Sequence, residues 1–341
     1  ATQAADDPYG DPLPEGALTR LGTVRYRVGF NYAPIVTPDA KTIYARDNWG
    51  LHRYDIAGAK LGALPPGSPT QPPVAFSADG TRAVTTSGTT VVWELATGKT
   101  LATVKRAVHY FDRGLPLADL SADGKVLVLG GGKERDPKGK EGIEVLVWDV
   151  DGNKEITRFL PPHNEQVFVA LAHDGKTVAS WGTYSDPTGK TDAETSPARY
   201  VNFWEAATGK PLAKVRATGS NPSAVAFSPG GTVAAVAGTS TIELVDPKTG
   251  TSKHLLLGRS GVGHSLAFSP DGTTLFAANN TGVVQRWRVA DGARLSTTEP
   301  PISDMYYCSV RATAADRAVA SATRSNTLIV WEVPSGKLLG P

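Results

Sequence analysis

The stretch Ala75–Leu101, AFSADGTRAVTTSGTTVVWELATGKTL, decides the fold. It contains three short β-prone segments; an Asp-Gly pair separates the first two, and the third ends in Trp93-Glu94. Asp-Gly turns between such segments are typical of antiparallel hairpins. A similar passage returns at Ala267–Leu295, AFSPDGTTLFAANNTGVVQRWRVADGARL. The sequence therefore predicts an internally repeated, all-β fold.

The chain contains seven copies of this unit, each with a Trp-acidic pair or a substitute at the end of its third segment. In chain order the pairs are Tyr54-Asp55, Trp93-Glu94, Trp148-Asp149, Trp204-Glu205, Val245-Asp246, Trp287-Arg288 and Trp331-Glu332. The turn glycines that follow are Gly58, Gly98, Gly152, Gly209, Gly250, Gly292 and Gly336. Neighbouring glycines are 40 to 44 residues apart, except for intervals of 54 and 57 that contain insertions at Lys133–Gly142 and Tyr184–Tyr200. This period is typical of four-stranded propeller blades.

The motifs FSADG, FSPDG, WDV and WEL at this spacing resemble the WD-repeat (WD40) family of bacterial type, over Leu18 to Pro341. The resemblance implies an all-β, seven-bladed WD40-type β-propeller with four antiparallel strands per blade. Few residues follow the last turn, so we expect the N-terminal strand Thr23–Phe30 to complete the last blade and protect its edge. Residues 1–16 are expected to form a flexible linker or arm, and residues 17–341 the propeller.

The family also implies a buried network of Asp, His, Ser or Thr, and Trp within each blade. His163 stands at the family's histidine position, His264 has a different spacing, and Asp47 lies in a turn of the first blade. No blade has the full set in the sequence. We therefore expect the tryptophans to fill the gaps between blades, and apolar burial to hold most blades together.

Composition limits the classes of partner. The 35 Lys and Arg nearly balance the 33 Asp and Glu, which does not favour nucleic acid as a partner. No apolar run approaches the length of a membrane span, so no membrane partner is expected. Cys308 is the single cysteine and is expected to be a buried, inert thiol. We expect a monomeric propeller and favour a cytoplasmic location.

A search for chemical motifs predicts no catalytic residue, no cofactor and no metal. A phosphate-binding P-loop needs a fixed glycine spacing and a following helix, and neither is present at Gly130–Gly132 or at Gly189-Lys190-Thr191. Both segments instead predict a flexible loop between the second and third strands. The six histidines show no metal-ligand spacing, and Asp149–Asn153 does not complete a calcium loop. Residues from several blades could still converge at the central channel.

Loops at the top face, between the second and third strands and between blades, are the predicted binding surface. Both insertions belong to adjacent blades and project from this side. Aromatic and arginine side chains often carry interface energy. The candidate partner-binding residues are Tyr32, Trp49, His109, Tyr110, Phe111, Arg113, Asn164, Tyr184, Tyr306 and Arg324.

The leading hypothesis is a non-catalytic scaffold that binds a protein or peptide through these loops. The segment Tyr9–Arg27 looks like the start of bacterial WD-repeat proteins in which the propeller follows another domain, such as a kinase or a sigma-like regulator. The alternative is a propeller-type hydrolase or lactonase acting at the channel mouth, where Asp304 and His264 are the nearest candidates. A purely structural spacer is a third possibility.

Overall fold

The computed structural model describes residues 35–47, 50–56, 61, 64–71, 73–106, 117–132, 143–184, 196–218, 221–238, 240–258, 262–279, 281–301, 306–313, 317–324 and 327–339. Within these ranges the chain forms 27 β-strands in seven sheets, and one 3₁₀-helix, η1 (Pro197–Arg199). Every strand pair described is antiparallel, with neighbours joined mainly in chain order. The all-β prediction is confirmed.

The sheets are numbered 1 to 7 in chain order, each given from its innermost strand outward. Sheet 1 contains β1 (Ile35–Val36), β2 (Thr42–Asp47) and β3 (Gly50–Asp55). Sheet 2 contains β4 (Pro73–Phe76), β5 (Arg82–Ser87), β6 (Thr89–Glu94) and β7 (Thr100–Val104). Sheet 3 contains β8 (Ala118–Leu120), β9 (Val126–Leu129), β11 (Val145–Asp149) and β12 (Lys154–Phe159).

Sheet 4 has five strands, because β10 (Gly131–Gly132) joins β13 (Gln166–Leu171), β14 (Thr177–Thr183), β15 (Tyr200–Glu205) and β16 (Pro211–Arg216). Sheet 5 contains β17 (Ala224–Phe227), β18 (Ala234–Ala237), β19 (Thr241–Val245) and β20 (Ser252–Leu257). Sheet 6 contains β21 (Val262–Phe268), β22 (Thr274–Asn279), β23 (Val284–Arg288) and β24 (Arg294–Thr298). Sheet 7 contains β25 (Tyr306–Ala312), β26 (Ala318–Arg324) and β27 (Thr327–Val333).

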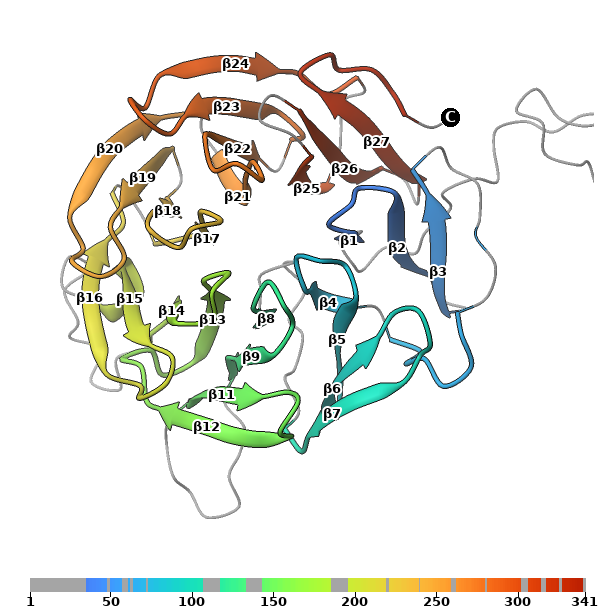
Figure 1. The fold of residues 1–341 in the computed structure, drawn as a ribbon. Helices are drawn as coiled ribbons and strands as arrows, with labels where there is room; N and C mark the ends of the chain where they lie inside the picture. Colours follow the sequence, from blue (N-terminus) through green and yellow to red (C-terminus); the bar gives the residue numbers. More distant parts are fainter. Residues whose placement is uncertain are drawn as a thin grey trace, which may run out of the picture.

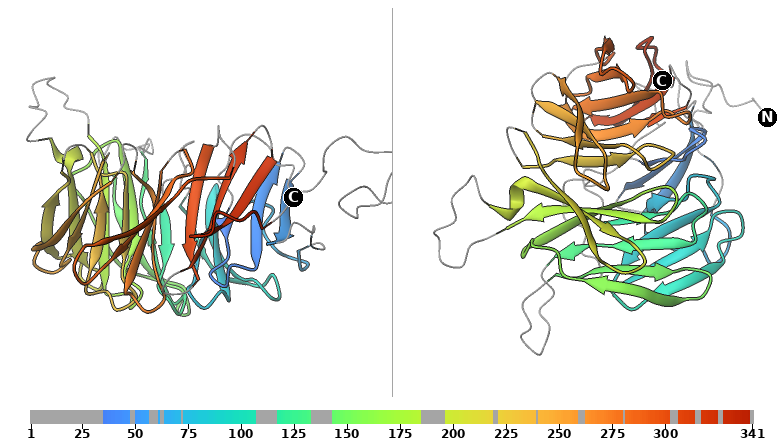
Figure 2. Two further views of the ribbon diagram at one scale, coloured as in Figure 1. Left: turned by 90° about the horizontal axis from the view of Figure 1, so that it is seen from above. Right: turned by 60° about the vertical axis from the view of Figure 1, so that its left-hand side comes forward.

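The sheets stand side by side around a ring, with the first strand of each sheet near the axis (Figure 1). The inner strands contact their neighbours in succession from β4 through β8, β13, β17 and β21 to β25. Seen edge-on, the strands run from one end of the ring to the other (Figure 2). A radial array of twisted antiparallel sheets is consistent with a β-propeller.

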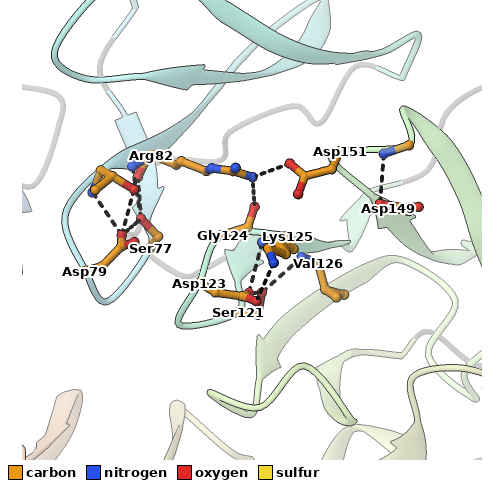
Figure 3. Close-up of polar contacts among 12 residues, drawn as sticks. Ser77, Asp79, Arg82, Ser121, Asp123, Gly124, Lys125, Val126, Asp149 and Asp151 are labelled. Atoms are coloured by element: carbon orange, nitrogen blue, oxygen red, sulfur yellow. Dashed lines mark hydrogen bonds and ion pairs between the residues drawn. The ribbon is translucent and has the colours of Figure 1, made fainter.

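In sheets 1, 2, 3 and 6, the turn that joins the first to the second strand has one motif, a Ser or Thr hydroxyl that donates to an Asp two residues later. We call the end of the ring that carries these turns the turn end. In sheet 2, Ser77 Oγ donates to Asp79 Oδ1 at 2.6 Å; in sheet 3, Ser121 Oγ donates to Asp123 Oδ1 at 2.7 Å (Figure 3). The following Gly80 and Gly124 have left-handed φ values of 70° and 67°, as the Asp-Gly pairs predict. These hydrogen bonds fix each turn, so the hairpins form where the sequence predicts them.

Arg82 links the turn ends of sheets 2 and 3. Its Nη1 donates to the carbonyl oxygen of Gly124 at 3.2 Å and to Asp151 Oδ1 at 2.7 Å (Figure 3). A Cβ at Gly124 would lie 2.6 Å from Arg82 Cδ, so a larger residue would displace the arginine. Neighbouring sheets are thus joined by polar contacts between their turns as well as by apolar packing.

The third turn of sheet 3 departs from the predicted pattern. In sheets 2 and 4 to 7, the glycine counted in the sequence adopts a left-handed φ, as Gly98 does at 74°. In sheet 3, Asn153 has the positive φ of 45°, one residue after Gly152. Asn153 lies five residues after Trp148, as Gly98 lies five residues after Trp93, so the left-handed position is the same and the glycine stands one residue early. Asparagine tolerates this region better than other non-glycine residues.

The tryptophans of the third strands pack between neighbouring sheets, as predicted. Trp93 packs with Tyr44 of sheet 1, and Trp331 packs with Phe276 of sheet 6. Trp93, Trp287 and Trp331 have at most 1% of their surface exposed. Burial of such large side chains is the main source of cohesion between sheets.

Two of these tryptophans have a hydroxyl partner on the second strand of their own sheet. Trp93 Nε1 donates to Thr85 Oγ1 at 2.9 Å, and Trp204 Nε1 donates to Ser180 Oγ at 2.9 Å. In sheets 3 and 7 the matching residues are Leu129 and Ala322, and among the described residues Nε1 of Trp148 and Trp331 finds no hydrogen-bond partner. Strand register therefore decides which indole is satisfied.

Among the described residues, sheet 4 comes closest to the buried polar network expected from the sequence resemblance. His163 is 2% exposed, and its Nε2 lies 3.4 Å from Asn202 Nδ2. Asn202 and Trp204 project from the same face of β15, and Trp204 reaches Ser180. This sheet thus combines a buried histidine, a hydroxyl and a tryptophan, while most sheets rely on apolar packing as expected.

Sheets 1 and 7 meet where the ring returns to its start. Val330 packs with Val36, Ile43 and Tyr54 of sheet 1. On the outer edge of β27, Leu338 pairs with Trp331, and the Leu339 N–H donates to the Val330 carbonyl at 2.9 Å. The C-terminal residues therefore occupy the beginning of the outer position that Thr23–Phe30 was predicted to fill. Thr23–Phe30 itself lies outside the described residues.

Candidate functional site

The starting points of both insertions lie side by side in sheet 4. Gly132 of β10 pairs with Gln166 of β13, and Gln166 pairs with Thr183 of β14. The chain leaves for the first insertion after Gly132 and for the second after Tyr184. We call this group (Gly132, Gln166, Thr183, with Asn164 and Tyr184 beside it) the insertion corner. It lies at the opposite end of the strands from the turn end.

Two glycines allow the backbones on both sides of β13 to lie close to it at this corner. A Cβ at Gly130 would lie 2.2 Å from the carbonyl oxygen of Val167, and one at Gly182 would lie 1.8 Å from that of Gln166. No side chain fits at those distances. The prediction that Gly130–Gly132 forms a flexible loop is wrong, because Gly131–Gly132 forms strand β10 and extends the next sheet. Glycine is needed here for its small size rather than for phosphate binding.

The return points of both insertions are also held in place. Arg106 of sheet 2 donates from Nη2 to the carbonyl oxygen of Glu144 at 2.6 Å, just before β11. Ser196 Oγ accepts from the N–H of Ala198 at 3.3 Å and caps η1, which leads into β15. The predicted insertion boundary at Tyr200 is one residue too long, because Tyr200 is the first residue of β15 and pairs with Arg216.

Only some of the predicted partner-binding residues belong to the described ranges. Asn164 and Tyr184 are half-buried and lie at the insertion corner. Tyr306 and Arg324 are placed by their backbone at the corresponding end of sheet 7, where Tyr306 pairs with Thr323. Asn164 and Tyr184 thus lie in one sheet, and Tyr306 and Arg324 in another that is not its neighbour in the ring (Figure 1). Tyr32, Trp49, His109, Tyr110, Phe111 and Arg113 lie outside the described residues.

The candidates for the hydrolase alternative are also incompletely described. Asp304 lies outside the described residues, and for His264 the structure gives the backbone position in β21. Within the described ranges, no group of three or more His, Cys, Asp and Glu residues could hold a metal ion. Cys308 is 6% exposed, and burial raises the pKa of its thiol to about 12, in line with the predicted inert role.

A second site, not predicted from the sequence, lies near the axis. In all seven sheets the residue that begins the first turn donates its backbone N–H to the start of the second strand. Two residues before it, the sheets carry Ile35, Ala75, Asp119, Ala170, Ala226, Ala267 and Arg311. Five of the seven equivalent positions are apolar. The two exceptions have opposite charges and lie in sheets 3 and 7, on opposite sides of the ring (Figure 1).

Asp119 connects the inner strands of sheets 3 and 4. Its Oδ1 accepts from the Leu120 N–H at 2.9 Å, and its Oδ2 accepts from the Leu171 N–H at 2.8 Å. The second bond satisfies a donor on the part of the inner edge of β13 that β10 does not cover. Burial raises the pKa of Asp119 to about 6, although the two N–H donors and the charge of Arg311 act in the opposite direction.

Arg311 and His173 complete what we call the axial cluster (Asp119, His173 and Arg311). The charge of Arg311 acts on both of the other groups across the axis, although the three residues come from three sheets. His173 lies in the first turn of sheet 4, and burial, with the charge of Arg311, lowers its pKa. All three residues are half-buried. The cluster therefore lies near the turn end and within reach of solutes.

The signal for the axial cluster was present in the sequence but required the strand register. ADLS at Ala118–Ser121 aligns with VAFS at Val74–Ser77, so Asp119 occupies the same position in its repeat as Ala75 in the preceding one. The seventh repeat lacks the Ser-x-Asp-Gly motif, so the sequence alone does not align Arg311 with the other six residues. The hydrogen bond from the Thr313 N–H to the Arg317 carbonyl fixes that register.

No helix in the described residues is long and apolar enough to cross a membrane. Comparison of the sequence with protein-family models and with curated proteins finds no match.

Proposed function

We propose that the chain is a seven-bladed WD40-type β-propeller that acts as a non-catalytic scaffold, binding a protein or peptide through the insertion corner of sheets 3 and 4. The proposal is supported by the seven radial sheets, by the repeated turn motif and by the packing of the tryptophans between sheets. Fold alone does not give function, so the insertion corner carries the functional part of the proposal.

The main support for this binding surface is the pairing of Gly132 with Gln166 and of Gln166 with Thr183. It brings the starting points of two insertions, far apart in sequence, to adjacent strands of one sheet. The connection from Leu160 to Glu165, which contains Asn164, enters the same sheet between them. Three loops that start from one rigid edge can form a continuous recognition surface.

The test is to shorten both insertions. Residues 133–142 and 185–195 are replaced by short Gly-Ser linkers, singly and together, and peptides are selected from a displayed library against the unmodified chain. Affinity is then measured by biolayer interferometry. We expect the double replacement to weaken binding by about tenfold or more, as loss of several interface anchors does.

The control is Lys248→Ala, an exposed residue in a turn of sheet 5 at the turn end, which should leave affinity unchanged. Peptides that bind the shortened and unmodified chains equally would contradict the insertion corner as the binding surface. Loss of binding in both the control and the shortened variants would contradict it as well.

The proposal includes closure of the ring by the N-terminal strand. Thr23–Phe30 would pair with the part of β27 beyond the contacts of Leu338 and Leu339, completing the fourth position of sheet 7. Deletion of Ala1–Val28 should then expose an edge and lower the melting temperature strongly, with aggregation on heating. A melting curve that matches the full chain would contradict this closure.

A further inference from the structure

The axial cluster differs from its surroundings in its unused hydrogen-bonding capacity. Both oxygens of Asp119 already accept backbone N–H groups, from Leu120 and Leu171. The Arg311 guanidinium carries five N–H donors. In the part of the chain that the structure describes, no direct hydrogen bond or ion pair engages that guanidinium; its charge acts on Asp119 at longer range. Within the described residues, the N–H donors of Arg311 therefore have no hydrogen-bond acceptor at the axis.

The apolar neighbours make this unused guanidinium costly for the fold. The equivalent positions in sheets 4, 5 and 6 are Ala170, Ala226 and Ala267, and none of them offers a polar side chain. A partly buried cation that is not hydrogen-bonded loses hydration without replacement. The alanines on these three sheets therefore add no side-chain acceptor for Arg311.

We propose that the axial cluster is a binding site for a small carboxylate, held by the Arg311 guanidinium between sheet 7 and sheets 3 and 4. A planar carboxylate matches the guanidinium fork with two parallel N–H···O bonds. The imidazole of His173 supplies a further N–H donor from sheet 4. This site is separate from the insertion corner, near the other end of the ring, and does not depend on the proposed scaffold function.

Asp119 gives the site a dependence on pH. When ionised, it attracts Arg311 but repels a carboxylate ligand; when protonated, it can donate a hydrogen bond to the ligand. The charged groups that act on it and on its neighbours are Arg311, His173 and Asp174. Since the pKa of Asp119 is about 6, carboxylate affinity rises as the pH falls from 7.5 to 5.5.

The experiment is a calorimetric titration of the full chain with sodium formate at pH 7.5 and 5.5, at ionic strength held constant with sodium chloride. We expect saturable binding that is about tenfold tighter at pH 5.5. Arg311→Lys keeps the charge but loses the fork, and should weaken binding at least tenfold. Acetate and benzoate, added in separate titrations, measure how large a carboxylate the site admits.

Two further variants distinguish a ligand-binding role of the axial cluster from a purely structural role of its charges. Asp119→Asn should bind formate with nearly equal affinity at both pH values, and Arg158→Lys, a matched change on the outer strand β12, should leave binding unchanged. If Arg311→Lys does not fold, the proposal is tested by formate binding to the wild type and by the pH dependence of that binding in Asp119→Asn. Absence of saturable formate binding at both pH values, unchanged binding in Arg311→Lys, or an unchanged pH dependence in Asp119→Asn would each overturn the proposal.

Discussion

Sheets 4 and 5 are neighbours built from the same repeat, yet they are stabilised in different ways. Sheet 4 contains a buried hydrogen bond from Trp204 to Ser180 and a buried His163. Sheet 5 has Val245 in place of the tryptophan, and its second strand β18 is AAVA, buried throughout. Sheet 5 shows that the repeat folds without a buried tryptophan–hydroxyl hydrogen bond and without a buried histidine. Sheet 4, which has these polar groups and the close backbone contacts, is also the sheet from which both insertions leave.

The largest expected effect comes from Gly182→Ala in sheet 4. Its new Cβ would lie 1.8 Å from the carbonyl oxygen of Gln166, which is backbone and cannot move aside. We expect a loss of about 3 kcal/mol in the free energy of unfolding, at the upper end of typical overpacking costs. Urea denaturation followed by circular dichroism measures the change.

The matched control for this change is Gly230→Ala in sheet 5. The nearest atom to its Cβ would be Thr232 Oγ1 at 4.0 Å, and Gly230 has no left-handed φ. The control should therefore be neutral or slightly stabilising. Equal effects of the two substitutions would show that β13 and β14 are not in the close contact described.

The next effect is a pH dependence contributed by His163. Burial, together with the positive charge of Lys214, lowers its pKa to about 4 from an ordinary value of 6.5. The contribution is complete above pH 6.5 and is lost as the pH falls toward 4, because the unfolded chain takes up the proton first. The total is about 3 kcal/mol, at about 1.4 kcal/mol per pKa unit.

The measurement is the difference in unfolding free energy between the wild type and His163→Gln from pH 7 to pH 4. This subtraction removes the contribution of Asp119, whose raised pKa acts with the opposite sign in the same range. His163→Gln should lose less stability than the wild type on acidification. Parallel pH profiles would mean that the pKa of His163 is the same in the folded and the unfolded chain.

A smaller effect is expected from Ser180→Ala. This change leaves the buried Nε1–H of Trp204 without its acceptor and should cost about 2 kcal/mol, within the range for an unsatisfied buried donor. The equivalent residue in sheet 5 is Val236, where Val236→Ala removes only apolar contacts. The combined variant Ser180→Ala with Trp204→Phe should cost less than the sum of the two changes; strict additivity would contradict the hydrogen bond.

The smallest effect is a gain. Gly230→Asp restores the Ser-x-Asp-Gly motif in sheet 5, where Ser228 has no carboxylate to bond as Ser121 has in Asp123. It also restricts the unfolded chain, so the melting temperature should rise in line with about 0.5 to 1 kcal/mol. A lower melting temperature would show that the motif is not transferable between sheets.

Local features of the fold were predictable from the sequence because they depend on residues close in the chain. Asp79-Gly80 predicted its turn, and Trp93 predicted the end of a third strand. The hydrogen bond of Trp93 to Thr85 was missed, although strand alternation brings the two to one face eight residues apart. Once the register is known, the hydroxyl positions separate satisfied from unsatisfied indoles.

The features that depend on contacts between sheets were not predictable in this way. Gly131–Gly132 has no β propensity, and it forms a strand because the backbone of β13 lies beside it. Asp119 and Arg311 are 192 residues apart and come together through the ring. Most of the predicted aromatic contacts at the top face fall outside the described residues, so they stay predictions.

Strand β10 has a consequence for how the molecule opens. It belongs by sequence to the third repeat and by hydrogen bonding to the fourth, so the boundary between two repeats does not coincide with a boundary between two ladders. Amide protons of sheets 3 and 4 should therefore exchange with solvent in one cooperative step, whereas sheet 5 can open separately. Excision of a single repeat at this junction would cut through a hydrogen-bonded sheet, and duplication or loss of one unit would be tolerated better elsewhere in the ring.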